Sequence, residues 1–525
     1  MKIVDSTAGS AGNREAIESP IQLPQRASPR LDLAWLAVII GIAAVLRFHL
    51  LAAKSFWFDE GVSIAIARLD WYNFARILWR REANMSLYYL FLHFWLHFGG
   101  SEFFVRSLSV LFAIASVPVI YVLGCRLFDS RVGLIAAALL TVNAYHVQYS
   151  QDARSYSLMV LLCLVSSLYF LKSLHDPSRR NRAVYVLSSA LAVYTQFFSG
   201  LLVIAQWLSL KRLDRAQIPS QTRNDWRWIA LLVSPVIVFV ATTGTGPLRW
   251  VQRPTLKDLW IFALHLTGNG GPWLLLACAV ACLVALLPVW HTLGTRRLPW
   301  ETWRHRFLVC WVLFPLLFVL GLSLLKPLFV LRYFVFCLPA LLLLVACGIA
   351  RIRSTAWMVP ALLLILILFL RGTAGYYKQD LDIQRDDWRA ASQYLLTQAQ
   401  SGDALLFHVP MGRMPYEFYH SLSTPASAAP AVLYPEHGDR LTFLDFVEKP
   451  DDAELERLLP QHARAWLVLT YAETQSGSPD SRSLELSKLL GNVYAMVEQR
   501  DFPGIEILLY SRSGAGTISP PRSSY

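Results

Sequence analysis

The stretch SFWFDEGVSIAIAR, residues 55–68, directly follows the first long apolar segment of the chain and carries two adjacent carboxylates, Asp59 and Glu60. An ionised side chain in hydrocarbon costs at least ~2.5 kcal/mol, so we expect the pair to lie at the membrane surface, in contact with water. One apolar helical face follows it, formed by Val62, Ala65, Ile66 and Leu69. This spacing predicts a helix at residues 61–69 that lies against the membrane.

Composition indicates a polytopic membrane protein. Of the 525 residues, 55% are apolar, 13% aromatic and only 16% charged, a balance typical of chains that spend most of their length in lipid. The net charge of +12 reflects many Lys and Arg residues between apolar spans, where topology and anionic lipids account for them. We find no signal for nucleic acid, and all seven cysteines fall in apolar spans, so we expect no disulfide framework.

Apolar windows of ~19 residues predict eleven membrane spans. The segments at 183–197 and 198–210 are short, so they form either two tilted helices or one interrupted excursion. The predicted spans are 33–53, 103–125, 131–149, 155–173, 183–197, 198–210, 228–246, 272–290, 307–325, 328–349 and 355–371. The sequence thus predicts a polytopic α-helical fold with about 11 transmembrane helices.

The positive-inside rule gives the orientation, since the loops that alternate onto one side are all basic. These loops place the N-terminus in the cytoplasm and both the first outer loop, 54–102, and the C-terminal region outside. Aromatic-rich residues 87–98 of that loop are predicted to form an interfacial helix. The alternative, a short transmembrane helix there, would invert everything downstream.

Four segments follow from this organisation. Residues 1–32 read as a disordered cytoplasmic tail, and residues 33–371 form the membrane domain. Helical patterns at 388–400 and 483–490 alternate with strand-like runs at 404–409, 465–470 and 505–510. This alternation predicts that residues 372–512 form an extracytoplasmic α/β domain. Residues 513–525, rich in Ser, Gly and Pro, read as a flexible tail.

A group of residues on the outer face suits transfer from a lipid phosphate. Such an enzyme needs a base for the incoming hydroxyl, for which Asp59 and Glu60 are candidates, and cations for the leaving phosphate. The candidate cations are Arg154, Arg332 and Lys326. Three of these candidates also have an ordinary structural explanation. Arg154 could pair with Asp152, Arg332 could extend from the end of a span toward water, and Asp59 could cap a helix. Their convergence on one face favours the functional interpretation.

Several motifs in order resemble a known family. FWFDE (56–60), YSQDARSYSL (149–158), KPLFVLRYF (326–334) and DDWRAASQYL (386–395) are similar to motifs of bacterial polyprenyl-phosphate-sugar-dependent glycosyltransferases of the GT-C type, which include relatives of the protein O-mannosyltransferases and the lipid A aminoarabinose transferase. The resemblance implies an inverting transfer with Asp59 as general base, Glu60 as its neighbour, and Arg154 and Arg332 as phosphate contacts. Relatives carry a basic or proline-containing turn where this chain has Asn84, Met85 and Ser86, so Arg80 or Arg81 would have to take the place of a lysine there.

The expected function is therefore transfer of a sugar from a polyprenyl-phosphate donor to a hydroxyl of a protein, lipid or glycan at the outer face of the inner membrane. No cofactor is expected to be required, although a divalent cation bridging the carboxylates and the phosphate remains open. A transporter or flippase for a lipid-linked saccharide is the alternative. Transporters usually show inverted repeats or ionisable residues near the midplane, and the sequence shows neither. A non-catalytic assembly or export component, which would need no surface carboxylate, is a third possibility.

Overall fold

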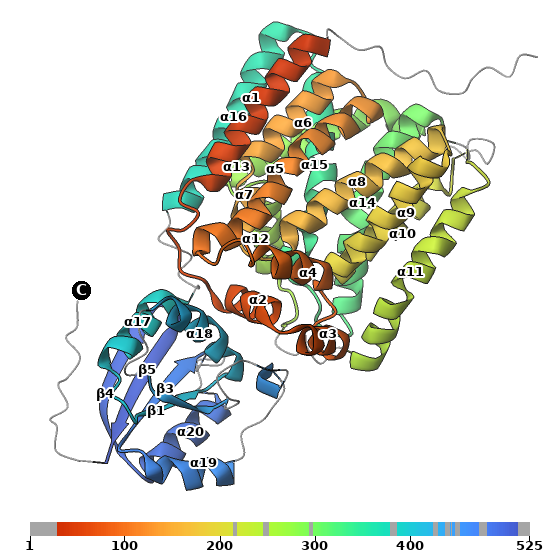
Figure 1. The fold of residues 1–525 in the computed structure, drawn as a ribbon. Helices are drawn as coiled ribbons and strands as arrows, with labels where there is room; N and C mark the ends of the chain where they lie inside the picture. The colour runs from red at the N-terminus through yellow and green to blue at the C-terminus, as the bar shows by residue number, and fades with distance from the viewer. Residues whose placement is uncertain are drawn as a thin grey trace, which may run out of the picture.

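The computed structural model describes residues 29–213, 218–244, 251–292, 298–378, 386–423, 429–435, 442, 444–446, 452–471 and 480–512. Long helices form a bundle, three short helices lie across one end of it, and a small α/β domain follows beyond them (Figure 1). The predicted tail at the C-terminus and residues 1–28 of the N-terminal tail fall outside the described residues. The first helix begins at Pro29, four residues before the predicted span.

Each of the eleven predicted spans falls on helical structure in the bundle. The matching elements, in chain order, are α1 (Pro29–Phe48), α5 (Glu102–Leu127), α6 (Ser130–Val142) with α7 (Ala144–Ser150), α8 (Tyr156–His175), α9 (Arg179–Thr195), η1 (Phe197–Ser199) with α10 (Gly200–Leu210), α11 (Thr222–Thr243), α13 (Pro272–Leu286), α14 (Trp300–Ser323), η5 (Leu331–Cys337) with α15 (Leu338–Ala350), and α16 (Thr355–Lys378). Within the described chain, seven spans, or eight counting the bent α6–α7 pair, are long and apolar enough to cross a membrane. The polytopic helical fold is confirmed, whereas the count of about 11 is not.

Contacts from Arg47 of the first span, α1, stabilise the bend of 60° between α6 and α7. Asn143 ends α6 and begins α7, and its side-chain oxygen accepts from the His146 backbone N–H at 3.0 Å. The fully buried Arg47 donates to the carbonyls of Leu140 and Thr141, both at 3.1 Å. The bend leaves backbone carbonyls at the end of α6 without a partner in the helix, and inside a membrane such groups need one. This need explains why an arginine lies within an apolar span.

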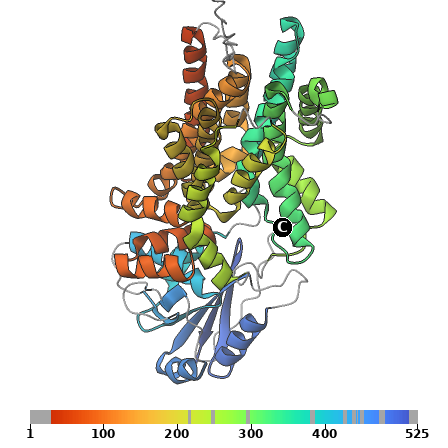
Figure 2. The same cartoon turned by 90° about the vertical axis from the view of Figure 1, so that its right-hand side faces the viewer.

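The helix ends that border the basic loops lie at the end of the bundle opposite the three short helices (Figure 2). Arg304, near the start of α14, donates to the Leu127 carbonyl at the end of α5 at 2.7 Å. Arg351, after α15, lies 3.1 Å from His305 of α14. The loops that we assigned to one side from their charge are therefore neighbours in space.

The first outer loop folds into α2 (Phe58–Arg68), α3 (Trp71–Arg80) and α4 (Ser86–Trp95). Helix α4 has 10 residues and is ~15 Å long, which is too short to cross ~30 Å of hydrocarbon. The length of α4 speaks against the alternative topology with a span here. Large side chains of α3 and α4 are exposed, as is typical of a membrane interface; they include Trp71, Tyr72, Trp79, Phe91 and Phe94.

Helix α2 differs from its prediction in both its start and its surroundings. It begins at Phe58, before the acidic pair, so Asp59 and Glu60 lie in its first turn. All residues from Glu60 to Ala67 are buried, because α2 packs against α4 and against α18 (Arg413–Leu422) of the C-terminal domain. The face that we expected to contact lipid contacts protein instead.

The C-terminal domain contains a five-stranded sheet with strand order β2-β1-β3-β5-β4. Strand β1 pairs in parallel with β2 and β3, and β5 pairs antiparallel with β3 and β4. The strands are β1 (Ala404–Phe407), β2 (Ala431–Tyr434), β3 (Arg464–Thr470), β4 (Ala495–Phe502) and β5 (Ile505–Ser511). The predicted α/β domain is confirmed, although the sequence did not reveal β2 and β4, which lie at the two edges.

Period-two alternation decides which helices cover each face of the sheet. Leu405 and Phe407 of β1 face α17 (Trp388–Gln398) and α18, whereas Ala404 and Leu406 face α19 (Asp452–Leu458) and α20 (Ser481–Gly491). The α17–α18 layer shares one apolar cluster with α2, α3 and α4. The C-terminal domain is therefore packed onto the acidic loop through a continuous core (Figure 1).

Candidate active site

Asp59 lies between two arginines from distant parts of the chain. Its Oδ2 atom is 3.5 Å from Nη2 of Arg154, in the turn between α7 and α8, and 3.3 Å from Nη2 of Arg332, in η5. The Asp59 side chain is 21% exposed, and those of Arg154 and Arg332 are 12% and 23% exposed. The three side chains predicted to act together thus meet, and each of them is partly exposed.

Both arginines are held by further contacts. Arg154 donates from Nη1 to the backbone carbonyl of Asp59 and to the Ser63 hydroxyl, both at 3.1 Å. The guanidinium of Arg332 lies over the Trp57 ring at 5.4 Å, and the preceding Leu331 carbonyl accepts from the Tyr145 hydroxyl at 2.6 Å. The cations are therefore fixed before any anion arrives, which lowers the entropic cost of binding one.

Glu60 points away from this group and is fully buried. Its Oε1 accepts from Arg106 Nε at 2.8 Å and from the Ala153 backbone N–H at 2.7 Å. Its Oε2 accepts from Arg106 Nη2 at 2.6 Å and from the Trp57 backbone N–H at 3.4 Å. Adjacent positions on a helix point in different directions, so Glu60 ties α2 to α5 and to the Arg154 turn, while Asp59 points to Arg154 and Arg332.

Arg106, which the sequence analysis did not single out, completes this connection. Besides its bonds to Glu60, it donates to the carbonyls of Leu51 (3.1 Å), Lys54 (2.7 Å) and Ser55 (2.9 Å). All five N–H groups of the guanidinium are thus used. An arginine within the apolar stretch EFFVRSLSV was the available signal, because a cation in a predicted span needs a partner.

A second carboxylate missed by the sequence analysis, Glu82, lies beside the cluster between α3 and α4. Loss of water around its carboxylate raises the pKa of Glu82 to about 7, and the negative charge of Asp59 adds to this shift. The Arg154 cation and a hydrogen bond from Tyr89 oppose it. A lone acid in the basic run RREANMS gave no reason to select it.

The other predicted phosphate contacts lie outside this group. Lys326 is exposed in the turn after α14, and Arg81 is exposed at the end of α3. Within the described chain, no ion pair joins either side chain to Asp59. The structure brings together Asp59, Arg154 and Arg332, but not Lys326 or Arg81.

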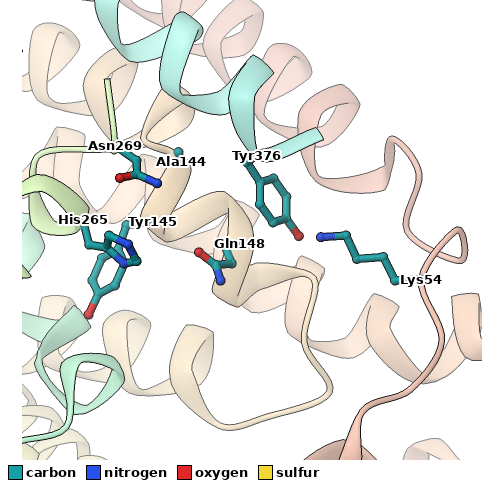
Figure 3. Close-up of a pocket in the computed structure, with 7 residues that line it drawn as sticks. All are labelled: Lys54, Ala144, Tyr145, Gln148, His265, Asn269 and Tyr376. Atoms are coloured by element: carbon teal, nitrogen blue, oxygen red, sulfur yellow. The ribbon is translucent and has the colours of Figure 1, made fainter. Parts of the chain in front are cut away.

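A polar cavity of about 80 Å³ lies nearby, between α7, α12 (Leu256–Leu266), the start of the outer loop and the end of α16 (Figure 3). Lys54 holds its ammonium 3.9 Å from the centre of the Tyr376 ring. The remaining lining residues are Ala144, Tyr145, Gln148, His265 and Asn269. Tyr145 joins the cavity to the arginine cluster, because its hydroxyl bonds the residue before Arg332.

The described residues contain no group of three or more His, Cys, Asp and Glu side chains arranged to hold a metal ion. Near Asp59, positive charge is supplied by the arginines. The arrangement offers one partly exposed carboxylate, which can accept a proton, between two cations that can bind a phosphate.

Comparison with known proteins finds matches to a family model and to solved structures. Residues 85–242 match the family model of dolichyl-phosphate-mannose-protein mannosyltransferases. The crystal structures of ArnT from Cupriavidus metallidurans, in the apo state and bound to undecaprenyl phosphate, each match with a TM-score of 0.61, at 12% and 13% identity. Each alignment covers 93% of this chain, with 100% and 99% of the respective ArnT chain. A comparison with curated proteins gives no significant match.

The archaeal oligosaccharyltransferase AglB from Archaeoglobus fulgidus, in complex with an inhibitory peptide and a dolichol-phosphate, matches with a TM-score of 0.49 at 11% identity. That alignment covers 92% of this chain and 74% of AglB. The matches to the mannosyltransferase family model and to ArnT confirm the predicted resemblance to GT-C glycosyltransferases. At this identity the ArnT match establishes the fold, which extends over nearly the whole chain.

We predict that Glu60→Gln lowers the free energy of unfolding by about 3 to 5 kcal/mol, because it leaves the Arg106 cation buried without its counter-charge. The thermal midpoint of the detergent-solubilised protein measures this loss. Glu454→Gln is the matched control, since Glu454 is 53% exposed in a surface pair with Arg457 and such pairs contribute at most about 1 kcal/mol. Equal midpoints for both variants would contradict the assignment.

A second prediction concerns pH. Glu82 keeps its proton up to a pKa of about 7, while in the unfolded chain it ionises near 4.5, so between these values the folded state binds more protons. Stability therefore falls as pH rises through this window. Glu82→Gln should remove that loss, so it should stabilise the protein relative to the parent more at pH 8 than at pH 5. The difference in the free energy of unfolding between the two pH values should be on the order of 1 kcal/mol per unit of pKa shift. Because the Glu82 side chain is partly exposed, solvent screening should reduce this difference.

Thermal unfolding of the parent and Glu82→Gln at both pH values tests this prediction. Glu485→Gln, at a side chain that is 61% exposed, controls for loss of one carboxylate. An identical difference between parent and Glu82→Gln at pH 5 and pH 8 would show that Glu82 titrates normally.

Proposed function

From the shared ArnT fold and the mannosyltransferase-family segment, we propose that the protein is a lipid-phosphate-sugar-dependent glycosyltransferase. It transfers a hexosyl or pentosyl group from a polyprenyl-phosphate donor to a hydroxyl of a protein, lipid or glycan acceptor, with inversion at the anomeric carbon. Asp59, held between Arg154 and Arg332 at 3.5 and 3.3 Å, is the observation that supports this proposal.

The reaction follows from what each side chain can do. The Asp59 carboxylate takes the proton of the acceptor hydroxyl as the hydroxyl oxygen attacks the anomeric carbon. The bond between that carbon and the phosphate oxygen breaks, and the polyprenyl phosphate leaves with the electron pair. Arg154 and Arg332 face the charge that grows on the leaving phosphate, where fixed guanidinium groups are most effective.

Both arginines contact Asp59 in the absence of substrate, so an arriving phosphate competes with the carboxylate for them. The phosphate draws on the positive charge of the two fixed guanidinium groups and weakens their attraction for Asp59, which can then accept a proton. Lys326 and Arg81, exposed near the same end of the bundle, remain our predicted additional contacts to the bound donor. Glu60 serves as a positioning residue in this mechanism, because its oxygens are occupied by Arg106, Ala153 and Trp57.

The proposed location is the inner membrane, with the N-terminus in the cytoplasm and the Asp59 loop and C-terminal domain outside. Support comes from the basic loops, which gather at the end of the bundle away from Asp59 (Figure 2) and which the positive-inside rule assigns to the cytoplasm. The donor thus reaches Asp59 from the outer leaflet.

We propose that transfer requires no organic cofactor, because the phosphate-linked donor is already activated. A divalent cation next to the carboxylates is tested within the same assay by adding a chelator. Loss of activity that is restored by a metal would assign a cation to the site in addition to the arginines.

The decisive experiment is release of sugar from a polyprenyl-phosphate donor by the detergent-solubilised protein. We expect Asp59→Asn to lower kcat by about 10²- to 10⁴-fold, the typical contribution of a positioned base, while the thermal midpoint stays near that of the parent. Asp70→Asn is the matched control, because Asp70 caps α3 in the same loop and asparagine caps equally well. Parent-like turnover by Asp59→Asn would refute the base assignment, and donor movement across vesicles without cleavage would instead support a transporter.

We further expect Arg332→Ala to raise the KM for the donor by about tenfold or more while changing the KM for the acceptor little, because a charged hydrogen bond to phosphate contributes about 1.5 to 3 kcal/mol. Steady-state kinetics with each substrate varied in turn measures the two constants. Arg353→Ala, at an exposed arginine in the loop after α15, is the control. Equal effects on both substrates would assign a structural role to Arg332.

A further inference from the structure

Arg154 lies in the turn between α7 and α8, and three hydrogen-bonded anchors fix that turn. The Gln151 side chain donates to two backbone carbonyls at the end of α1 and just after it, at 2.9 and 2.8 Å. The Ala153 backbone N–H donates to Glu60 at 2.7 Å. The third anchor is the backbone carbonyl of Arg154 itself, which accepts from the Ser109 hydroxyl of α5 at 3.2 Å.

Ser109 bonds differently from other serines of its helix. A serine inside a helix can donate to the carbonyl three or four residues earlier in the same helix. Ser107 and Ser116 of α5 do this, at 2.6 and 3.0 Å. Ser109, which is fully buried, donates instead across the bundle to the Arg154 carbonyl. Its hydroxyl therefore links α5 to the arginine turn.

Tyr88 of α4 sets the direction of this link. Its hydroxyl lies 2.9 Å from Ser109 Oγ, and its side chain is fully buried. A hydroxyl has one proton, and Ser109 uses its proton on the Arg154 carbonyl, which can only accept. Tyr88 is therefore the donor to Ser109. Donation into the serine oxygen polarises its own O–H group, so the two bonds strengthen each other.

The turn before α4 holds Tyr88 in place. The Asn84 side-chain oxygen accepts from the Phe197 backbone N–H at 3.1 Å. The Ser86 hydroxyl donates to the Tyr194 carbonyl at 3.3 Å. Both partners lie where α9 ends and η1 begins. This turn, at which the sequence departs from the basic or proline-containing turn of its relatives, therefore attaches α4 to the membrane bundle.

We propose that Tyr88 and Ser109 are positioning residues for Arg154. The hydrogen bonds from Tyr88 to Ser109 and from Ser109 to the Arg154 carbonyl fix the backbone from which the guanidinium extends. The guanidinium end is fixed by α2, through the Asp59 carbonyl and the Ser63 hydroxyl, both at 3.1 Å. An arginine that is held at both ends loses little side-chain freedom when it binds an anion.

This inference rests on the proposed function only for its effect on catalysis. Its structural part is measurable without any substrate, because the backbone N–H groups of Ala153 and Arg154 donate to Glu60 and to the Asp152 carbonyl. Such groups exchange with solvent only when the turn opens. Hydrogen–deuterium exchange of the full-length protein at residues 151–155 reports that opening.

Ser109→Ala leaves the buried Arg154 carbonyl without its donor. It should speed amide exchange at residues 151–155 by about 5- to 100-fold, the range expected when a buried hydrogen-bonding group loses its partner. It should raise the donor KM by about 3- to 10-fold through a misplaced guanidinium, while the acceptor KM changes less than about twofold. Ser109→Thr keeps the hydroxyl and should restore most of both properties.

A double-mutant cycle tests whether the two residues act as one unit. Tyr88→Phe alone should change exchange and donor KM in the same direction as Ser109→Ala, by about 2- to 5-fold. In the Ser109→Ala background, Tyr88→Phe should have no further effect, because both residues act through the same serine hydroxyl.

Ser116→Ala and Tyr185→Phe are the matched controls. Ser116 is a fully buried serine of the same helix whose hydroxyl bonds within that helix. Tyr185 is a fully buried tyrosine of α9 that donates to Gln206 at 2.9 Å. We expect both variants to lower the thermal midpoint while exchange at residues 151–155 and both KM values stay near those of the parent.

Unchanged exchange at residues 151–155 in Ser109→Ala would overturn the proposal. Equal increases in donor and acceptor KM would do the same, as would effects of Tyr88→Phe and Ser109→Ala that multiply in the double variant. If Ser109→Ala does not fold, faster exchange in Tyr88→Phe than in Tyr185→Phe supports the proposal, and equal exchange overturns it. Absence of sugar transfer by the parent would refute the proposed function alone, because exchange at the turn would still decide the role of the pair.

Discussion

The buried ion pair between Glu60 and Arg106 is the constraint on which the site depends. Two charges out of water are tolerated only when their hydrogen-bonding capacity is filled, and here four donors reach the glutamate while all five N–H groups of the arginine find acceptors. Three of the arginine's acceptors are the backbone carbonyls of Leu51, Lys54 and Ser55, in the segment between α1 and α2. The pair therefore fixes where the chain leaves the membrane and which way the next carboxylate, Asp59, points.

Helix α2 is held from two sides, and the cluster forms where they meet. The membrane bundle contributes Arg154, from the turn that follows the bend at Asn143, and Arg332, from the irregular start of the η5–α15 span. The C-terminal domain contributes the surface of α18, against which Gly61 packs. A carboxylate placed between two independently supported arginines needs little reorganisation when a phosphate arrives, which is the advantage of a preorganised charged site.

Much of the fold could be read from the sequence because the bilayer imposes a simple rule. All eleven apolar windows fall on helical structure, and the basic loops gather at one end. The count failed because several helices are bent or short, and a hydropathy window does not distinguish an interrupted span from a shorter buried helix. The apolar face of α2 was assigned to lipid, since a periodic pattern shows that a face is buried but not what buries it.

By itself, the sequence determined the polytopic helical class, the α/β nature of the C-terminal domain, and the selection of Asp59, Arg154 and Arg332, because charges at span ends are few and costly. Only the tertiary structure decided that Glu60 turns inward to Arg106 and that Glu82 lies beside the cluster. The bonds of Glu60 to Arg106 and to Ala153 join residues 46 and 93 positions apart in the chain. Their partners are chosen by packing in three dimensions, which local spacing does not encode.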